Sequence, residues 1–319
     1  MKVLGFDTSN YTTSVAWYDG EQWDNQSKLL PVKEGELGLR QSDALFNHVI
    51  GLPELTDRLF FNVDPSEIRA VGVSTRPRAV EGSYMPCFLA GIGHAKTIAQ
   101  LLHVPLIEVS HQQGHLAAVL RSAQCMELRK EPFLAWHLSG GTTELLLVEP
   151  MGSNLNCTIL GGTTDISAGQ LIDRTGQLLK LPFPAGKTLD ELSKAAQNKD
   201  YFRVKCPDTY FSLSGVQNKV QEYLSNTCSQ EETAGYALRC VCRAVEKATK
   251  NALDRFPGLP VVFSGGVASN SMLRKIMEPY DCVFCPPQYA TDNALGVAVL
   301  AWHILEEQNA AGDFISQRS

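Results

Sequence analysis

The sequence predicts an α/β protein built from two lobes, each with a mixed central sheet covered by helices. Apolar, strand-like runs alternate with stretches of helical spacing along the 319 residues, which is typical of layered α/β folds. In addition, one strand–turn–strand design occurs twice, at residues 3–18 and 133–148, which indicates two lobes with the same plan. The chain length suits two domains or one large α/β unit.

The N-terminal lobe is expected to comprise residues 1–130, with 293–319 packing back on it. It opens with an apolar strand, a polar turn and a β-branched, aromatic strand. The expected elements are a strand at 3–6, a turn at 7–10, a strand at 13–18, a helix within 36–62, a strand at 69–74, a helix at 91–102, a strand at 104–109 and a last helix near 293–308.

The C-terminal lobe is expected to comprise residues 131–292. It repeats the opening hairpin and continues with helices around a further strand. The expected elements are a strand at 133–138, a turn at 139–143, a strand at 145–148, a helix at 167–181, a polar and mostly helical insert at about 187–225, a long helix at 230–255, and a strand, glycine turn and helix within 259–277.

Net charge, cysteine content and the lengths of the apolar runs limit the kinds of function and location that the chain could have. The net charge is −6 and there is no basic run, so any RNA-binding role would use a local patch or partner proteins. Nine scattered cysteines suit free thiols in a reducing cytoplasm, and Cys282 and Cys285 lack a second well-spaced pair for a zinc knuckle. We expect a cytoplasmic protein, because the N-terminus does not suit a signal peptide and no apolar run is long enough to span a membrane.

Two histidines four residues apart, His111 and His115, follow an apolar, strand-like run. Residues at this spacing share one helix face, so both imidazoles can reach one metal ion, although exposed helix histidines are the plain alternative. A zinc protease would place a glutamate beside the first histidine as a base. Here that neighbour is Gln112, which cannot accept the proton of a metal-bound water.

Three polar turns follow predicted strands, at 7–10, 139–143 and 264–270. Small residues let backbone N–H groups approach an anion closely, and the third turn also opens a helix. Each turn alone could be ordinary, but together they favour a nucleotide bound between the lobes, with Asp7 able to hold Mg²⁺ through water. The candidates for the phosphate side are Asp7, Thr8, Ser9, Gly265 and Gly266.

Seven blocks in order carry a family resemblance. They read GFDTSNYTTSVA, HQQGHLAA, LSGGTTELLLV, GGTTDISAGQLIDRTGQLLKLPFPAGKTLDELS, FSLSGVQNKV, FSGGVASNSMLR and ATDNALGVA. The chain resembles the TsaD-like tRNA threonylcarbamoyladenosine transferases, formerly called O-sialoglycoprotein endopeptidases. The resemblance implies the two-lobed fold shared by actin, the sugar kinases and the Hsp70 ATPase (the ASKHA fold), with duplicated mixed-sheet lobes.

The resemblance also implies site residues. One divalent metal, iron or zinc, would be held by His111, His115 and Asp292. The implied substrate and nucleotide contacts are His137, Leu138, Ser139, Gly140, Gly141, Asp173, Gly186 and Asn270. Asp173 would accept hydrogen bonds from ribose hydroxyls.

The implied activity is an acyl transfer. A threonylcarbamoyl group would pass from its adenylate to the exocyclic amine of a tRNA adenosine next to the anticodon. The implied ligands and partners are an adenine nucleotide (ATP or acyl-AMP) with Mg²⁺, the tRNA, a paralogous subunit, an ATPase and a carbamoyl-adenylate synthase. A non-catalytic nucleotide-binding subunit, or a related carbamoyltransferase with another acceptor, remains open.

The chain departs from the family pattern where the family faces its substrate. The family's glycine-rich loop is RPRAVEG at 76–82, where two arginines could bind an anion or simply be solvated charges. The other replacements are Thr142 for histidine, Ile166 for aspartate, Gln170 for glutamate and Gln217 for lysine. This pattern indicates a divergent paralogue.

Overall fold

The computed structural model describes residues 1–9, 11–31, 39–61, 63–286 and 294–316. The chain divides into two compact units, which are described separately below. The first comprises Met1–Glu131, Glu149–Cys157 and Thr291–Ser319, and the second Pro132–Val148 and Thr158–Ala290. In the part of the chain that is described, no helix is both long and apolar enough to cross a membrane.

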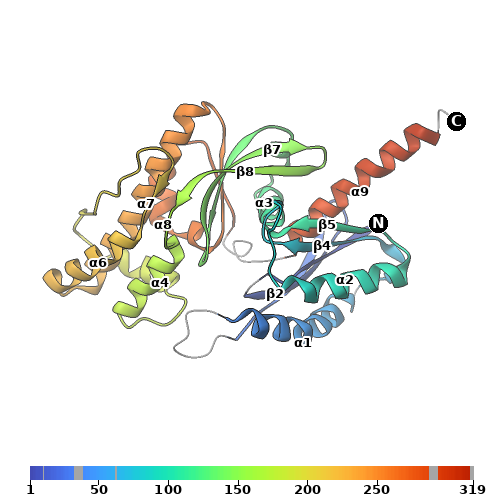
Figure 1. The fold of residues 1–319 in the computed structure, drawn as a ribbon, viewed down its shortest axis with the longest axis horizontal. Helices are drawn as coiled ribbons and strands as arrows, with labels where there is room; N and C mark the ends of the chain where they lie inside the picture. Colours follow the sequence, from blue (N-terminus) through green and yellow to red (C-terminus); the bar gives the residue numbers. More distant parts are fainter. Residues whose placement is uncertain (10, 32–38, 62, 287–293, 317–319) are drawn as a thin grey trace. The chain divides into compact units, whose positions relative to one another are not determined.

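The first unit contains a five-stranded mixed sheet (Figure 1). Its strands are β1 (Lys2–Asp7), β2 (Thr12–Tyr18), β3 (Trp23–Leu29), β4 (Ile68–Arg76) and β5 (Leu106–Ser110). In the order β3-β2-β1-β4-β5, the first three are antiparallel neighbours, whereas β4 is parallel to both β1 and β5. The carboxyl ends of β1, β4 and β5 therefore meet at one edge.

Helices cover both faces of this sheet. They are α1 (Gln41–Phe60), α2 (Phe88–Leu102), α3 (His111–Ser122) and α9 (Leu295–Ser316), with short 3-10 turns at Pro65–Glu67 and Met126–Lys130. Leu4 and Phe6 pack with α1 and α2 in one apolar core. On the other face, a Cβ on Gly5 would lie 2.5 Å from the backbone oxygen of Ala294, so glycine lets the start of α9 approach the strand.

The second unit contains a six-stranded sheet. Its strands are β6 (Phe133–Leu138), β7 (Thr143–Met151), β8 (Asn154–Thr163), β9 (Tyr210–Phe211), β10 (Val261–Ser264) and β11 (Cys282–Phe284), in the order β11-β10-β6-β7-β8-β9. β6 is antiparallel to β7 and parallel to β10, which is parallel to β11. The order β8-β7-β6-β10-β11 repeats β3-β2-β1-β4-β5, which confirms the duplicated mixed-sheet plan.

The helices of the second unit are α4 (Ala168–Leu178), α5 (Gly186–Ser193), α6 (Ser214–Thr227), α7 (Gln230–Arg255) and α8 (Ser271–Met277), with a 3-10 turn at Gly266–Ser269. The long α7 packs on the sheet, where the buried Trp136 Nε1 donates to Thr249 Oγ1 at 2.8 Å. The stretch at 187–225 is less helical than the sequence predicts, because α5 and α6 are separated by irregular chain and the short β9.

Several other elements differ from the sequence-based expectations. The strands β3, β8 and β11 were not predicted, and α9 continues to Ser316 rather than ending near 308. The first helix begins at Gln41, while residues 36–38 and 62 of its predicted range lie outside the described residues. All nine cysteines are within the described ranges and none of them forms a disulfide bond, as predicted.

Candidate functional site

The carboxyl ends of the parallel strands of the first unit bring together three distant segments. β1 ends at Asp7, Ser74 lies near the end of β4, and β5 ends at Ser110, directly before α3. Ser110 caps α3 in a capping box with Gln113, because its hydroxyl accepts from Gln113 N while the glutamine side chain accepts from Ser110 N. This cap fixes where α3 begins, and therefore where His111 lies.

His111 and His115 face each other on α3. Their Nε2 atoms are 2.8 Å apart and their ring centroids 4.2 Å apart. On the other side of its ring, His111 Nδ1 lies 2.9 Å from Asp7 Oδ2. The predicted histidine pair is thus brought together, and the structure adds a carboxylate from β1 that spacing in the sequence could not reveal.

The donor set fits a divalent metal. Zinc binds imidazole nitrogen at about 2.0–2.1 Å, and two nitrogens 2.8 Å apart can both reach one ion at that distance. Asp292, the predicted third ligand, lies outside the described residues. Within the described ranges, no group of three or more histidine, cysteine, aspartate or glutamate side chains is arranged around one point.

The side chains of the first turn, at Asp7, Thr8 and Ser9, are buried within the first unit. Asp7 is 1% exposed, and its carboxylate accepts from Ser74 Oγ, from Ser9 N at 3.2 Å and from Ser9 Oγ at 3.2 Å. Thr8 Oγ1 donates to Cys87 O at 3.0 Å and accepts from Gly91 N at 3.1 Å. The side chains that were predicted to face a phosphate therefore make hydrogen bonds within the first unit.

In the second unit, the turn after β6 is open to solvent at its two glycines. A Cβ on Gly140 or Gly141 would meet no atom within 4 Å. The turn is closed by Ser139 N donating to Thr142 O at 2.8 Å and by Thr142 N donating to Ser139 Oγ at 3.1 Å. The Ser167 hydroxyl donates to Gly140 O at 2.6 Å, which packs the turn on the start of α4.

The end of β6 itself is buried. Leu138 is fully buried, and His137 Nδ1 lies 3.1 Å from Ser264 Oγ on the neighbouring β10. After β10 comes the second glycine turn, where Gly265 has φ +88° and a Cβ would lie 2.3 Å from Leu138 O. Gly266 beside it has open space around it. The two predicted turns of this unit are therefore neighbours at the carboxyl ends of β6 and β10.

Asp173 and Gly186 lie close together. Asp173 Oδ1 accepts from Ala185 N at 2.9 Å, and Gly186 is the first residue of α5. Burial raises the pKa of the Asp173 carboxyl above its usual range, although the hydrogen bond from Ala185 opposes that shift.

Asn270 is hydrogen-bonded to Asp190, a residue that was not predicted from the sequence as part of the site. Asn270 Nδ2 donates to Asp190 Oδ1 at 2.8 Å, while its own Oδ1 caps α8 by accepting from Leu273 N at 2.9 Å. Asp190 also accepts from Ser271 Oγ at 3.0 Å. Asp190 follows Gly186 by four residues on α5, a helical spacing that could have marked it as lying on the same face.

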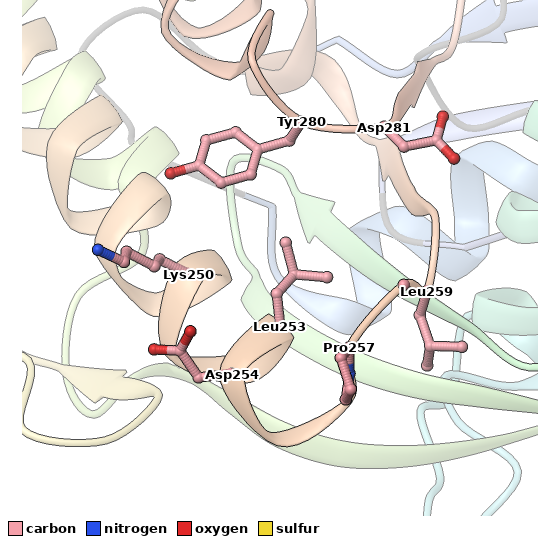
Figure 2. A pocket seen from close by; sticks show the side chains of 8 residues that line it. Lys250, Leu253, Asp254, Pro257, Leu259, Tyr280 and Asp281 are labelled. Atoms are coloured by element: carbon pink, nitrogen blue, oxygen red, sulfur yellow. The ribbon is translucent and has the colours of Figure 1, made fainter.

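A shallow hollow of about 430 Å³ lies elsewhere in the second unit (Figure 2). It is lined by Lys250, Leu253, Asp254, Pro257, Gly258, Leu259, Tyr280 and Asp281. Leu259 lies two residues before β10 and Asp281 directly precedes β11, so the hollow lies at the amino ends of those strands. Ligands of open α/β sheets bind at the carboxyl ends, and none of the predicted site residues lines this hollow.

Comparison with known proteins identifies the family. A family model described as TsaD, tRNA N6-adenosine threonylcarbamoyltransferase, matches residues 37–299. A tRNA N6-adenosine threonylcarbamoyltransferase from Carboxydothermus hydrogenoformans is 30% identical, with 94% of this chain and 91% of that protein covered. One from Streptococcus suis is 32% identical, with 78% of this chain and 75% of that protein covered.

Solved structures confirm the predicted fold of actin, the sugar kinases and the Hsp70 ATPase. Full-length HypF in a phosphate- and nucleotide-bound form matches with a TM-score of 0.62 at 16% identity, covering 96% of this chain and 46% of that one. A hexokinase of the ROK family from Thermus thermophilus matches with a TM-score of 0.53 at 15% identity, covering 96% and 100%. These structures show the fold, whereas the family follows from the sequence matches: the chain belongs to the tRNA N6-adenosine threonylcarbamoyltransferase family.

Proposed function

We propose that the protein transfers a threonylcarbamoyl group from threonylcarbamoyl-AMP to the exocyclic amine of a tRNA adenosine next to the anticodon. The observation that carries this proposal is the pair of facing imidazole nitrogens of His111 and His115 in a chain of this family. The pair lies at the carboxyl edge of parallel strands, where open α/β sheets bind their ligands.

His111 and His115 would hold one divalent metal, iron or zinc, with Asp292 as the third ligand. Two imidazoles and a carboxylate leave coordination positions open for a substrate. When bound, the metal supplies a Lewis acid that polarises the acyl group.

Residues of the second unit would hold the adenine nucleotide. Asp173 would accept hydrogen bonds from ribose hydroxyls. Further polar contacts would come from Gly186, Asp190 and Asn270, which lie around α5 and α8. The open backbone at Gly266 would allow close approach of a polar ligand.

The reaction itself needs little covalent help from the protein. The adenosine amine attacks the carbamoyl carbon, a C–N bond forms, the C–O bond to phosphate breaks, and AMP leaves with the electron pair while the amine proton passes to solvent. Because the adenylate is already activated, positioning does most of the work. Ser139 and Thr142 use their N–H groups within the turn, so we assign the developing negative charge to the N–H groups of Gly140 and Gly141.

Arg76 would bind an anionic part of the acyl-adenylate. It ends β4, with its Cα paired with that of Ser110, and the next residue, Pro77, accepts through its carbonyl from Gln112 N at 3.0 Å. Arg76 is half-buried, and among the described residues its side chain has no hydrogen bond or ion pair. A guanidinium in this position suits a carboxylate or a phosphate.

The acidic net charge agrees with a need for partners in holding tRNA. We propose a paralogous subunit, an ATPase and a synthase of the carbamoyl-adenylate as those partners, on the basis of family membership.

The proposal is tested by mass spectrometry of tRNA nucleosides from cells that lack the protein. Threonylcarbamoyladenosine should fall in the deletion strain and return with the wild-type chain, but not with His111→Ala. His103→Asn, which changes an exposed histidine of the same unit, should restore it fully. An unchanged nucleoside in the deletion strain would overturn the proposed acceptor.

A further inference from the structure

We propose that Asp7 is a positioning residue for His111, holding its ring so that Nε2 is presented as an electron-pair donor to a metal. This inference rests on the metal site of the proposed function. Asp7 Oδ2 lies 2.9 Å from His111 Nδ1, and the opposite ring nitrogen faces His115. A carboxylate accepts hydrogen bonds only, so His111 must carry its proton on Nδ1 to make this contact.

That constraint settles the roles of both histidines in the metal-free protein. With its proton on Nδ1, His111 has a lone pair on Nε2. His115 Nε2, at 2.8 Å, then donates its proton to that lone pair. The two rings therefore have opposite tautomers in the metal-free protein. To hold a metal together with His111, His115 would have to move its proton from Nε2 to Nδ1.

Asp7 is itself held firmly. It is almost fully buried, with hydrogen bonds from Ser74 Oγ on β4 and from the backbone and hydroxyl of Ser9. Phe88 makes an edge contact with the His111 ring at 6.2 Å between centroids. A carboxylate fixed from β1 and β4 can hold an imidazole at the start of α3 in one orientation, which a solvent-exposed carboxylate could not.

This role differs from the one that the first turn suggests in the sequence. From the sequence alone, Asp7 is a candidate for holding Mg²⁺ on the phosphate side of a nucleotide. In the structure its oxygens face Ser9, Ser74 and His111. Carboxylates that bind the second nitrogen of a metal-ligating histidine fix its tautomer and raise its basicity, and their loss typically costs about 10–100-fold in metal affinity.

The first test is long-range ¹H–¹⁵N NMR of the metal-free protein at alkaline pH, with His111 and His115 assigned by substitution. We expect the proton of His111 on Nδ1 and that of His115 on Nε2. In Asp7→Asn, a nearly isosteric change, His111 should become a mixture of tautomers. A wild-type His111 protonated on Nε2 overturns the proposal, even if no Asp7 variant folds.

The second test is the affinity for Co²⁺, measured by competition with a chelator, together with the visible spectrum of the Co²⁺ protein. Asp7→Asn should bind Co²⁺ about 10–100-fold more weakly than the wild type and show a changed spectrum. Asp19→Asn is the matched control, because within the described part of the chain that carboxylate accepts only from the nearby backbone of Glu21 and Gln22. Equal affinities of Asp7→Asn and the wild type would refute the positioning role.

The two tests separate this inference from the proposed function. If the wild-type protein binds no Co²⁺, the metal site is wrong, but the tautomer of His111 still decides whether Asp7 orients it. If Co²⁺ binds and Asp7→Asn changes neither the tautomer of His111 nor the affinity for Co²⁺, the metal site is supported and the positioning role of Asp7 is refuted.

Discussion

Gly296 in α9 packs directly against Gly114 in α3: a Cβ on Gly296 would lie 1.8 Å from the carbonyl oxygen of Gly114. Gly114 is on the same turn of α3 as His111 and His115. The close crossing of α3 and α9 therefore depends on glycine at the point where the histidines are presented.

Gly296→Ala should destabilise the protein by about 3 kcal/mol or more, because backbone atoms of α3 and α9 would have to separate. Denaturant unfolding measures the loss. The matched control is Gly93→Ala in α2, where a Cβ meets no atom within 4 Å and alanine favours the helix by about 0.5–1 kcal/mol. Equal stabilities of the two variants would contradict the packing described for α3 and α9.

Asp173 should make the stability of the second unit depend on pH. Because burial raises its pKa in the folded protein, the folded state binds this proton more tightly than the unfolded state. The resulting stabilisation is complete below the ordinary carboxyl pKa and is lost as the pH rises through the raised folded-state pKa. Asp173→Asn keeps an acceptor for Ala185 N without the charge, so it should lack this decline.

Urea unfolding of both proteins between about pH 3 and about pH 7 checks this prediction. The stability difference should move in favour of Asp173→Asn as the pH rises. Parallel pH profiles would show that the carboxyl is not perturbed. The same variant should bind AMP more weakly if Asp173 holds the ribose.

Arg76→Gln should weaken binding of a non-hydrolysable acyl-adenylate by about 10–100-fold, the usual worth of a hydrogen bond to a charged group. AMP affinity, measured alongside, shows which anion of the acyl-adenylate Arg76 binds. If affinity falls for both ligands, Arg76 binds the phosphate. If it falls for the acyl-adenylate alone, Arg76 binds the carboxylate. Arg69→Gln, on the exposed side of the same strand, is the control. Unchanged affinity for both ligands in Arg76→Gln would exclude Arg76 from the site.

The sequence predicted the strands that are apolar runs bounded by polar turns. The hairpins β1–β2 and β6–β7 have apolar, β-branched runs on either side of a polar turn. β3 was missed because WDNQSKL is a partly exposed edge strand without apolar alternation, and pairing with β2 is what makes it a strand.

Spacing along one helix could predict the histidine pair, but contacts between distant segments could not be predicted. Asp7 reaches His111 only because β1, β4 and β5 are neighbours in the sheet. Asp190 likewise meets Asn270 through the packing of α5 near the start of α8. One departure from the family pattern also has a structural explanation: Gln170 completes the capping box of α4 with Ser167, as a glutamate would.

The central claim is tested most directly by the metal content of purified protein after loading with Fe²⁺ or Zn²⁺ and removal of excess ions. The account predicts about one metal per chain for the wild type and almost none for the double variant His111→Ala, His115→Ala, with both proteins folded. The same metal content in both proteins, or none in the wild type, would contradict it.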